Sequence, residues 1–494
     1  MQMLAREFSI NCVYTQALTL KSRLFNQFIN PFFKMSNTFS RKKAVRQREI
    51  LNIFGIFVNN NMAGGVFLLL CSAFALLAAN LDSLKGFHDI WNINADIAIG
   101  KFKLEMSLHH WVNDALMVVF FFVVGLEIKR EMMVGKLSSF KKASLPIFAA
   151  LGGMIVPAII YTIFNAGTES QNGWGIPMAT DIAFSLGVIA LLGSAVPVSL
   201  KIFLTALAIV DDLGAIIVLA VFYPSHEIHT EYLLYAGVIV SLLLLFNRLN
   251  IHRAALYLIP GIFLWYFVLQ SGIHATIAGV ILAMCIPSKS PINEVRFYVR
   301  SKYYLDKFKK ASNGEVNILA NPEQIQIIHD LHSKIRKVNP LINRFEHRIN
   351  PWVTYSIMPI FALANAGVTF SGILDEKSFT AISSGIFFGL LFGKPIGIFL
   401  LSYLSCKLKI AEMPLDIKWS QIFSVGIIAG IGFTMSIFID SLAFSNETLI
   451  NEGKAAVLLT SFFAAVIGLI ALKLTLEKVE PKIRYKKIRD LKTI

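Results

Sequence analysis

The chain is dominated by apolar stretches that are long enough to cross a lipid bilayer as helices. Because the hydrocarbon core of a bilayer is about 30 Å thick, a spanning helix needs about 20 mainly apolar residues. Of the 494 residues, 55% are hydrophobic and only 16% are charged, which is unlike a set of soluble domains. The sequence predicts an all-α polytopic membrane protein with about twelve transmembrane helices. The twelve stretches centre near Leu70, Val119, Ile155, Ser185, Ala215, Val240, Leu264, Val280, Met358, Leu390, Ala429 and Ala465.

Lysine and arginine alternate between crowded and sparse links along the chain. They are crowded in residues 41–48, 129–142, 248–253, 289–348 and 407–418 and after residue 473. They are sparse in residues 81–106, 165–174 and 441–452. Because links rich in Lys and Arg stay in the cytoplasm, both termini are expected there, which agrees with an even number of spans. The net charge of +15 does not indicate a nucleic-acid partner, because these residues form no single patch.

The charge pattern divides the chain into one transmembrane domain and two basic flanks. The predicted domain covers residues 50–476 and contains a long basic cytoplasmic loop, 289–350. Residues 1–49 are a basic extension expected in the cytoplasm, and residues 477–494 are a basic cytoplasmic tail. Met35 opens the basic lead-in "MSNTFSRKKAVRQREI", and we hypothesise that translation starts there.

Two links have patterns of their own. In residues 89–106, the partly alternating "ADIAIGKFKLE" around Gly100 predicts a small β-hairpin outside the membrane. In the cytoplasmic loop, "NPEQIQIIHDLHSKIRKV" predicts an amphipathic helix, because apolar residues recur at helical spacing. These residues are Ile325, Ile328, Leu331 and Ile335. Such a helix either lies along the membrane and covers the cytoplasmic mouth or packs as soluble structure, and the pattern fits both.

Two spans are predicted to be interrupted. The fourth, "GWGIPMATDIAFSLGVIALLG", has Gly175 and Pro177 in its first half and a Thr180-Asp181 pair at its middle. The eleventh, "VGIIAGIGFTMSIFI", carries three glycines, at positions 426, 430 and 432. Glycine and proline open a transmembrane helix only where protein or water takes up the freed backbone groups. Since the two spans run in opposite directions in matching triplets, they predict an inverted repeat whose interrupted helices cross at mid-membrane.

The fifth span places two adjacent carboxylates, Asp211 and Asp212, in the apolar run "LTALAIVDDLGAIIVLAVF". Left ionised and unpaired at the bilayer centre, they would cost roughly 5 to 7 kcal/mol. Lys201 marks the cytoplasmic edge of this span, and ten residues of helix put Asp211 about 15 Å deeper. Adjacent helical residues point about 100° apart, so the two carboxylates are expected to meet different neighbours. Lys394, also at mid-span, is one candidate partner.

The predicted chemistry follows from hard oxygen ligands. Carboxylates, the hydroxyl of Thr180 and backbone carbonyls suit a small hard cation, and the same carboxylates bind protons. If cation and proton compete for one site and only loaded states reorient, competition becomes obligatory exchange. Asp181 would balance the positive ends of the half-helices and Lys394 their negative ends. The sequence contains no GxxxxGK[ST] loop, and this exchange requires no ATP.

Other interpretations compete with this one. Asp181 and Lys394 also fit a structural charge set that neutralises helix ends. Four residues at a span end fit charges that reach into water: Glu127, Lys129, Arg130 and Glu131. An intramembrane aspartyl protease also buries two aspartates, but on different helices and within YD and GxGD motifs, and no GxGD occurs here. A passive cation channel is the second alternative, and it would conduct without proton movement.

The motifs "ATDIAFSLGVIALLG", "LAIVDDLGAII", "SGIHATIAGVI", "FALANAGV", "GKPIGI" and "GIGFTMSIFI" closely resemble the NhaA family of bacterial sodium/proton antiporters, in order, from about Gly64 to Leu472. The resemblance implies twelve helices, with the fourth and eleventh interrupted and crossed. It implies a bacterial inner-membrane protein that exchanges Na+ or Li+ for protons electrogenically, with sodium leaving the cell. It implies a homodimer joined partly through the external hairpin 89–106, and no cofactor.

The resemblance also assigns roles to individual residues. It implies that Asp211 and Asp212 bind the cation and the proton, that Thr180 and Asp181 lie at the helix break, and that Lys394 accompanies Asp211, either as a proton carrier or as a stabilising partner. A pH-regulating cluster at the cytoplasmic mouth is implied for Glu127, Arg130, Glu131, Glu346 and His347. The chain departs from the family in its N-terminal extension, in the longer link over residues 303–340, and at Asn350, where the family often has His.

Overall fold

The fold is described from a computed structural model of the full chain. The structure describes residues 61–84, 86–99, 102–135, 138–223, 228–290, 292–312, 321–369 and 380–476. The chain forms two units, Met1–Ala63 and Gly64–Ile494, and the residues of the predicted site belong to the second. The predictions for residues 1–49, for a start at Met35 and for the tail 477–494 lie outside the described residues.

Long apolar helices make up most of the described chain. Seven are long and apolar enough to cross a membrane, or nine if each of two bent helix pairs counts as one span. The seven are α3 (Asn61–Asn80), Leu108–Met133 (α5 Leu108–Trp111, π-helix η4 Val112–Leu116, α6 Met117–Met133), α7 (Phe140–Asn165), α9 (Val198–Phe222), α10 (Thr230–Arg248), Ala381–Lys407 (α17 Ala381–Phe388, π-helix η9 Gly389–Gly393, α18 Lys394–Lys407) and α21 (Glu447–Thr475).

The bent pairs are the regions where the sequence predicts interrupted helices. One joins the 3-10 helix η5 (Glu169–Met178) to α8 (Ile182–Ala190) with a bend of 46°. The other joins α19 (Trp419–Ala429) to α20 (Phe433–Ala443) with a bend of 49°. Two shorter apolar helices are α11 (Ala255–Gln270) and α12 (Thr276–Cys285). A further helical run comprises α15 (Leu341–Trp352), the π-helix η8 (Val353–Ile357) and α16 (Met358–Asn365).

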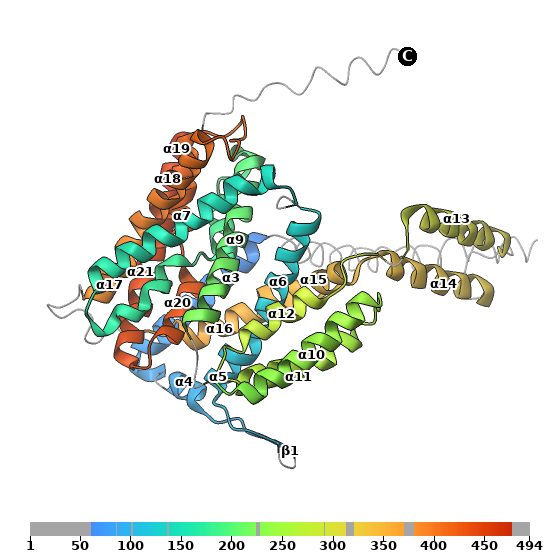
Figure 1. The fold of residues 1–494 in the computed structure, drawn as a ribbon, viewed down its shortest axis with the longest axis horizontal. Coiled ribbons are helices and arrows are strands. Elements are labelled where there is room, and N and C mark those ends of the chain that lie inside the picture. The colour runs from blue at the N-terminus through green and yellow to red at the C-terminus, as the bar shows by residue number, and fades with distance from the viewer. Residues whose placement is uncertain are drawn as a thin grey trace, which may run out of the picture. The chain divides into compact units, whose positions relative to one another are not determined.

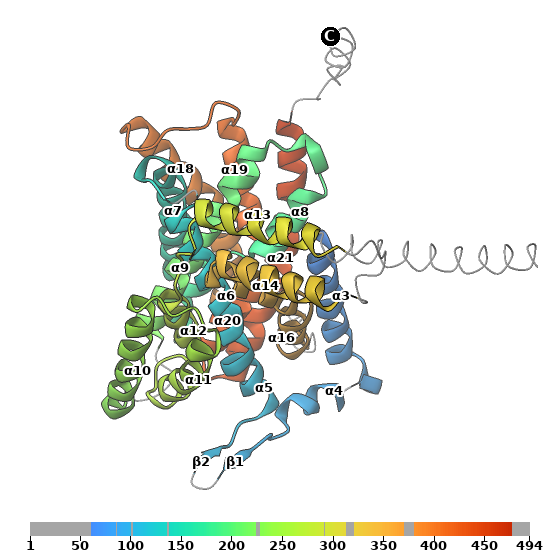
Figure 2. The ribbon, with the colours of Figure 1, turned by 90° about the vertical axis from the view of Figure 1, so that its right-hand side faces the viewer.

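The helices pack as a large bundle with a smaller group at its side (Figure 1, Figure 2). In the bundle, α7 lies along α18, α19 packs on α18 and α21, and α9 packs on α7. The contact between α7 and α18 requires glycine on both sides, because a Cβ at Gly152 would meet the carbonyl of Gly397 and the reverse. The smaller group contains α10, α11, α12 and α6 around a second apolar core.

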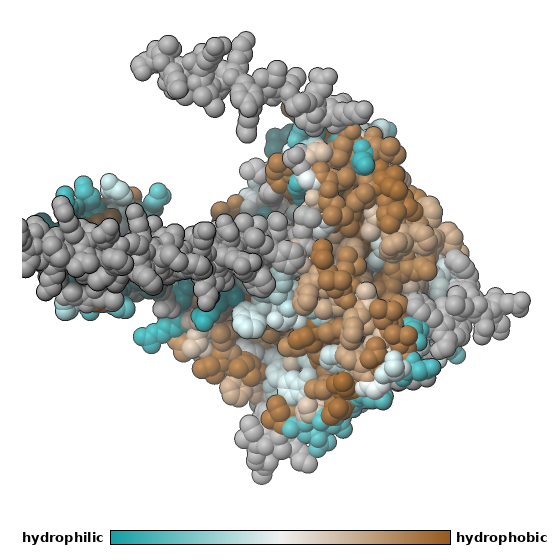
Figure 3. Space-filling view, turned by 180° about the vertical axis from the view of Figure 1, so that it is seen from behind, coloured by the Kyte–Doolittle hydropathy of each residue, from teal (hydrophilic) through white to brown (hydrophobic). Residues whose placement is uncertain are grey.

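Apolar side chains cover the outside of the bundle as well as filling its core. Leu70, Ile163, Val221 and Phe462 are among the exposed large apolar residues, each more than 60% exposed. Figure 3 shows apolar residues over much of one face. Because a water-soluble protein seldom exposes contiguous apolar surface of this kind, the described helices form a multi-pass membrane protein.

The predicted hairpin is present, as β1 (Ile97–Ile99) and β2 (Phe102–Leu104), antiparallel with Ile97 opposite Leu104. It follows short helical turns, η2 (Asp82–Leu84), α4 (Gly86–Asp89) and η3 (Ile90–Asn92). A further 3-10 turn, η6 (Gly193–Ala195), precedes α9.

The predicted amphipathic helix is also present, as α14 (Pro322–Val338), packed on α13 (Glu294–Lys310). Its predicted stripe forms only part of the packed side, because Ile325 and Leu331 are half-buried. Ile327 is buried, whereas Ile328 and Ile335 are 44% and 48% exposed.

Candidate functional site

The two helix breaks lie against each other and share one carboxylate. The main-chain N–H of Asp181 donates to the carbonyl of Ile431 at 2.8 Å, which joins the two breaks directly. Asp181 Oδ1 accepts from the N–H of Phe184 at 3.0 Å, so this side chain caps the start of α8. Its Oδ2 accepts from Thr434, through the N–H at 3.3 Å and the hydroxyl at 2.5 Å. The carboxylate therefore faces the N-terminal ends of both α8 and α20, where helix dipoles favour negative charge.

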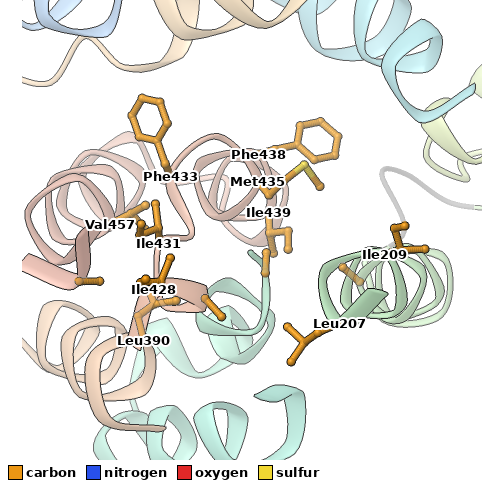
Figure 4. Packing of buried hydrophobic residues seen from close by; sticks show 14 of the residues in the cluster. Leu207, Ile209, Leu390, Ile428, Ile431, Phe433, Met435, Phe438, Ile439 and Val457 are labelled. Carbon is orange, nitrogen blue, oxygen red and sulfur yellow. The ribbon is translucent and has the colours of Figure 1, made fainter. Parts of the chain in front are cut away.

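Hydroxyl groups bind the opposite helix end. Thr180 Oγ1 lies 2.9 Å from the carbonyl oxygen of Ala429, and Ser185 donates to the carbonyl of Ile428 at 3.2 Å. Both carbonyls belong to the last turn of α19, and that of Ile428 also accepts from the N–H of Ile431 at 3.0 Å. The sequence predicts that Lys394 balances the charge of this end, and the ammonium group of Lys394 contacts the same Thr180 hydroxyl. Apolar side chains, including Ile428, surround the break (Figure 4).

The site's lysine pairs with one of the two aspartates. Lys394, the first residue of α18, is 0% exposed, and its ammonium group lies 2.5 Å from Asp211 Oδ2. It also donates to Thr180 Oγ1, and that hydroxyl is 2.6 Å from the same carboxylate oxygen. Asp211, on α9, is 1% exposed. A buried carboxylate is tolerated when paired and hydrogen-bonded, so Asp211 has its charge compensated by protein groups.

Asp212, the next residue of α9, has a different environment. It is also 1% exposed, and its Oδ1 has no hydrogen-bond partner in the described structure. Asp211 Oδ1 is likewise without one. Two buried carboxylate oxygens thus have no hydrogen-bond partner among the described residues near the two helix breaks. The described residues contain no cluster of three or more His, Cys, Asp or Glu side chains suited to a metal.

A second charged group forms around Arg130, near the end of α6. Its guanidinium lies 2.8 Å from Glu346 on α15, 3.3 Å from Glu131 and 3.9 Å from Glu127. Glu346 is 8% exposed, and its Oε2 has no hydrogen-bond partner among the described residues. Burial raises the pKa of Glu346, Arg130 and His347 oppose that rise, and Glu131 adds to it. His347 itself is exposed. The structure therefore brings three of the five residues, all of them glutamates, around the fourth, Arg130.

Comparison with known proteins places the chain in a family. The family model described as Na+/H+ antiporter 1 matches residues 56–472. The chain belongs to this antiporter family. A "Na(+)/H(+) antiporter NhaA" of Wolinella succinogenes is 45% identical over 83% of this chain and 91% of that protein. The proteins of the same name from Oleidesulfovibrio alaskensis and Helicobacter pylori (strain G27) are 43% and 45% identical, over 88% and 84% of this chain and 96% and 94% of their own lengths.

In this NhaA-family chain, sequence reasoning missed two residues that organise the helix crossing. Thr434 binds Asp181, and Ser185 binds the end of α19. Thr434 lies in the stretch "GIGFTMSIFI", where the glycines are the more prominent signal. A hydroxyl residue just after a predicted helix break was the available signal, because helix starts favour Ser and Thr.

Proposed function

We propose that the chain is a secondary active transporter that exchanges Na+ or Li+ for protons across the bacterial inner membrane. Sodium leaves the cell, protons enter, and the exchange is electrogenic. The three relatives from Wolinella, Oleidesulfovibrio and Helicobacter are Na+/H+ antiporters, and membership of their family supports this assignment. Transport of this kind is a secondary process and makes no covalent change in its substrates.

One observation carries the proposal: Asp211 and Asp212 are buried together, and each has an oxygen without a protein partner among the described residues. Ionised carboxylates away from water are costly, so a cation or a proton bound to those oxygens stabilises the site. Both ligands need the same lone pairs, so binding of one displaces the other. Na+ and Li+ are hard cations that prefer oxygen ligands, as the neighbouring carboxylates and the Thr180 hydroxyl provide.

The bent helix pairs are the proposed moving parts. They meet at Asp181 and Thr434, beside the carboxylate pair. We assign them to the interrupted fourth and eleventh spans of an inverted repeat, which rock against the rest of the bundle and expose the site to one side at a time. Lys394 keeps Asp211 in place during this motion, and whether it also carries a proton is left to experiment.

The proposed topology has twelve spans with both termini in the cytoplasm. Seven of these spans are the long helices and two are the bent pairs. The remaining three are the shorter apolar helices α11 and α12 and the helix around Met358. The basic links define the cytoplasmic side. The hairpin β1–β2 and the start of α19, which follows a basic link, stand at opposite ends of the bundle in Figures 1 and 2, as this orientation requires.

Two further properties belong to the same proposal. The Arg130 cluster, with Glu127, Glu131, Glu346 and His347, regulates transport by pH, because Glu346 has a raised pKa and directly binds the arginine. The hairpin joins two copies of the chain in a homodimer. Ile97 and Ile93 in and beside it are 47% and 56% exposed, as residues of a contact surface would be in one copy alone.

The test uses everted membrane vesicles acidified inside and loaded with a pH-sensitive fluorescent dye. Adding Na+ or Li+ should dissipate the acid interior, and Asp212→Asn should abolish the response. Asp212 is the cleanest position to change, since Asp211 keeps its bonds to Lys394 and Thr180. Asp416→Asn is the matched control, because this carboxylate is bonded by Ser199 at the protein surface, far in sequence from the pair.

The alternatives predict other results. A passive channel would let Na+ enter without proton movement, and a protease would cleave protein regardless of the sodium gradient. If neither cation changed the dye signal at any pH from mildly acidic to alkaline, in vesicles that contain the protein, antiport would be wrong.

A further inference from the structure

A second buried acid and lysine lie outside the site around Asp211 and Asp212. Asp440 is in the last turn of α20 and is 0% exposed. Lys454, on α21, is 8% exposed. Six residues of helix separate Asp440 from Thr434, about 9 Å along the axis, so this pair is distinct from the helix crossing. Neither residue lies in the motifs that carry the resemblance to the NhaA family.

The main chain of α21 is fitted to the carboxylate of Asp440. Gly453 lies directly against it, and a Cβ at this glycine would come 2.6 Å from Cγ and 3.0 Å from Oδ2 of Asp440. Any side chain at position 453 would displace the carboxylate. Because Gly453 precedes Lys454 in the chain, this contact brings α21 and its lysine next to Asp440 on α20.

The carboxylate nevertheless has no donor. Neither of its oxygens has a hydrogen-bond partner among the described residues. The nearby hydroxyls are used elsewhere: Tyr161 on α7 donates to the carbonyl of Ser170 at 2.8 Å, and Ser441 donates to the carbonyl of Phe438 at 2.8 Å. The titratable groups that interact with Asp440 through space are Lys454 from α21 and Tyr161 from α7.

A fully buried carboxylate without a donor is a costly charge, whereas the protonated acid is neutral. We propose that Asp440 is a second proton-binding site of this protein, which holds its proton in the observed arrangement, and that Lys454 is the positioned counter-charge for its release. On release, the O–H bond of the carboxyl group breaks, a water molecule takes the proton, and the ammonium group of Lys454 compensates the carboxylate left behind. That water reaches Asp440 from the outer side of the membrane rests on the proposed topology. The binding of a proton by Asp440 does not rest on it.

The test is infrared difference spectroscopy on the purified full-length chain in lipid, titrated with pH. The wild-type protein should show the C=O stretching band of a protonated carboxyl group at neutral pH that is missing from Asp440→Asn. Lys454→Met should retain this band to more alkaline pH, because release loses its counter-charge. Glu447→Gln is the control: this exposed carboxylate lies on the same helix as Lys454 and should not alter the band.

A wild-type spectrum identical to that of Asp440→Asn would overturn the proposed proton site. A band in Lys454→Met with unchanged pH dependence would overturn the role given to the lysine. If Asp440→Asn does not fold, Asp440→Glu takes its place and should move the band, and an unmoved band then contradicts the assignment. Asp212→Asn should keep the band, so the loss of antiport and the loss of this proton are read separately.

Discussion

Replacing Lys394 by methionine should destabilise the folded chain by about 3–5 kcal/mol near neutral pH. At the observed 2.5 Å, Coulomb's law with an effective dielectric constant of about 20 gives an attraction of about 7 kcal/mol for the pair with Asp211. Desolvation of two groups that are 0% and 1% exposed offsets part of that attraction. The variant instead leaves a buried carboxylate with only the Thr180 hydroxyl as donor, so the desolvation cost remains without the gain.

The double variant Asp211→Asn/Lys394→Met separates the charge pair from simple loss of packing. It removes both charges, so it should be more stable than Lys394→Met alone, with a coupling energy of several kcal/mol. The measurement is unfolding of the purified chain in detergent micelles, followed by circular dichroism, for the wild type, both single variants and the double variant. Lowering the pH should shrink the deficit of Lys394→Met, because a proton on Asp211 replaces the missing ammonium group.

The reasoning fails if the two substitutions are additive. A double variant that loses the sum of both single losses would mean that Lys394 and Asp211 contribute through packing and not through each other's charge. A deficit of Lys394→Met below about 1 kcal/mol would have the same meaning, since exposed pairs contribute about that much.

Two further predictions concern residues around the site. Thr434→Val should cost about 1.5–3 kcal/mol of stability and slow antiport, because it removes the 2.5 Å hydrogen bond to Asp181. Thr434→Ser keeps a hydroxyl and should restore both stability and antiport. Thermal unfolding measures the first and the vesicle assay the second. Glu346→Gln should flatten the pH dependence of unfolding. Burial, the largest cause, raises the folded-state pKa of Glu346 above the usual 4.5. The stability that Glu346 contributes is therefore complete below its unfolded-state pKa and is lost as the pH rises through its folded-state pKa. Equal slopes in wild type and Glu346→Gln would contradict this.

The sequence predicted a site at Asp211 and Asp212 and a charged partner, Lys394, because a charge inside an apolar run is costly and must be compensated. Asp211 does meet Lys394, and the helix pairs bend where Thr180, Asp181 and the glycines were expected to interrupt them. Their assignment to an inverted repeat and their roles in transport stay predictions. The position of Thr434 just after a predicted break fits a helix start, but the sequence does not show that its hydroxyl binds Asp181 from another helix.

The sequence also could not predict which side of α14 packs on α13. Its apolar residues recur at helical spacing on more than one side, and only contact with α13 decides that Ile327 is buried while Ile328 is exposed. Asp440 shows the same limit in a charged residue. It stands near the end of a span, where a charge reaches water without cost, and its burial depends on the approach of Gly453 from another helix.

The buried carboxylates differ in what compensates their charge. This difference distinguishes groups that stabilise the fold from groups that can bind a transported ion. Asp181 is held by two helix starts and Thr434, and the Oδ2 atom of Asp211 is held by Lys394, so these groups are compensated without any ion. Asp211 Oδ1 and Asp212 Oδ1 are buried with no hydrogen-bond partner in the described part of the chain, although one more donor would have stabilised the fold. A site fully satisfied by its own protein would bind a cation weakly, because binding would first have to break those bonds. These two oxygens are therefore where an exchangeable ion contributes most, and a donor introduced next to Asp212 should raise stability while it abolishes exchange.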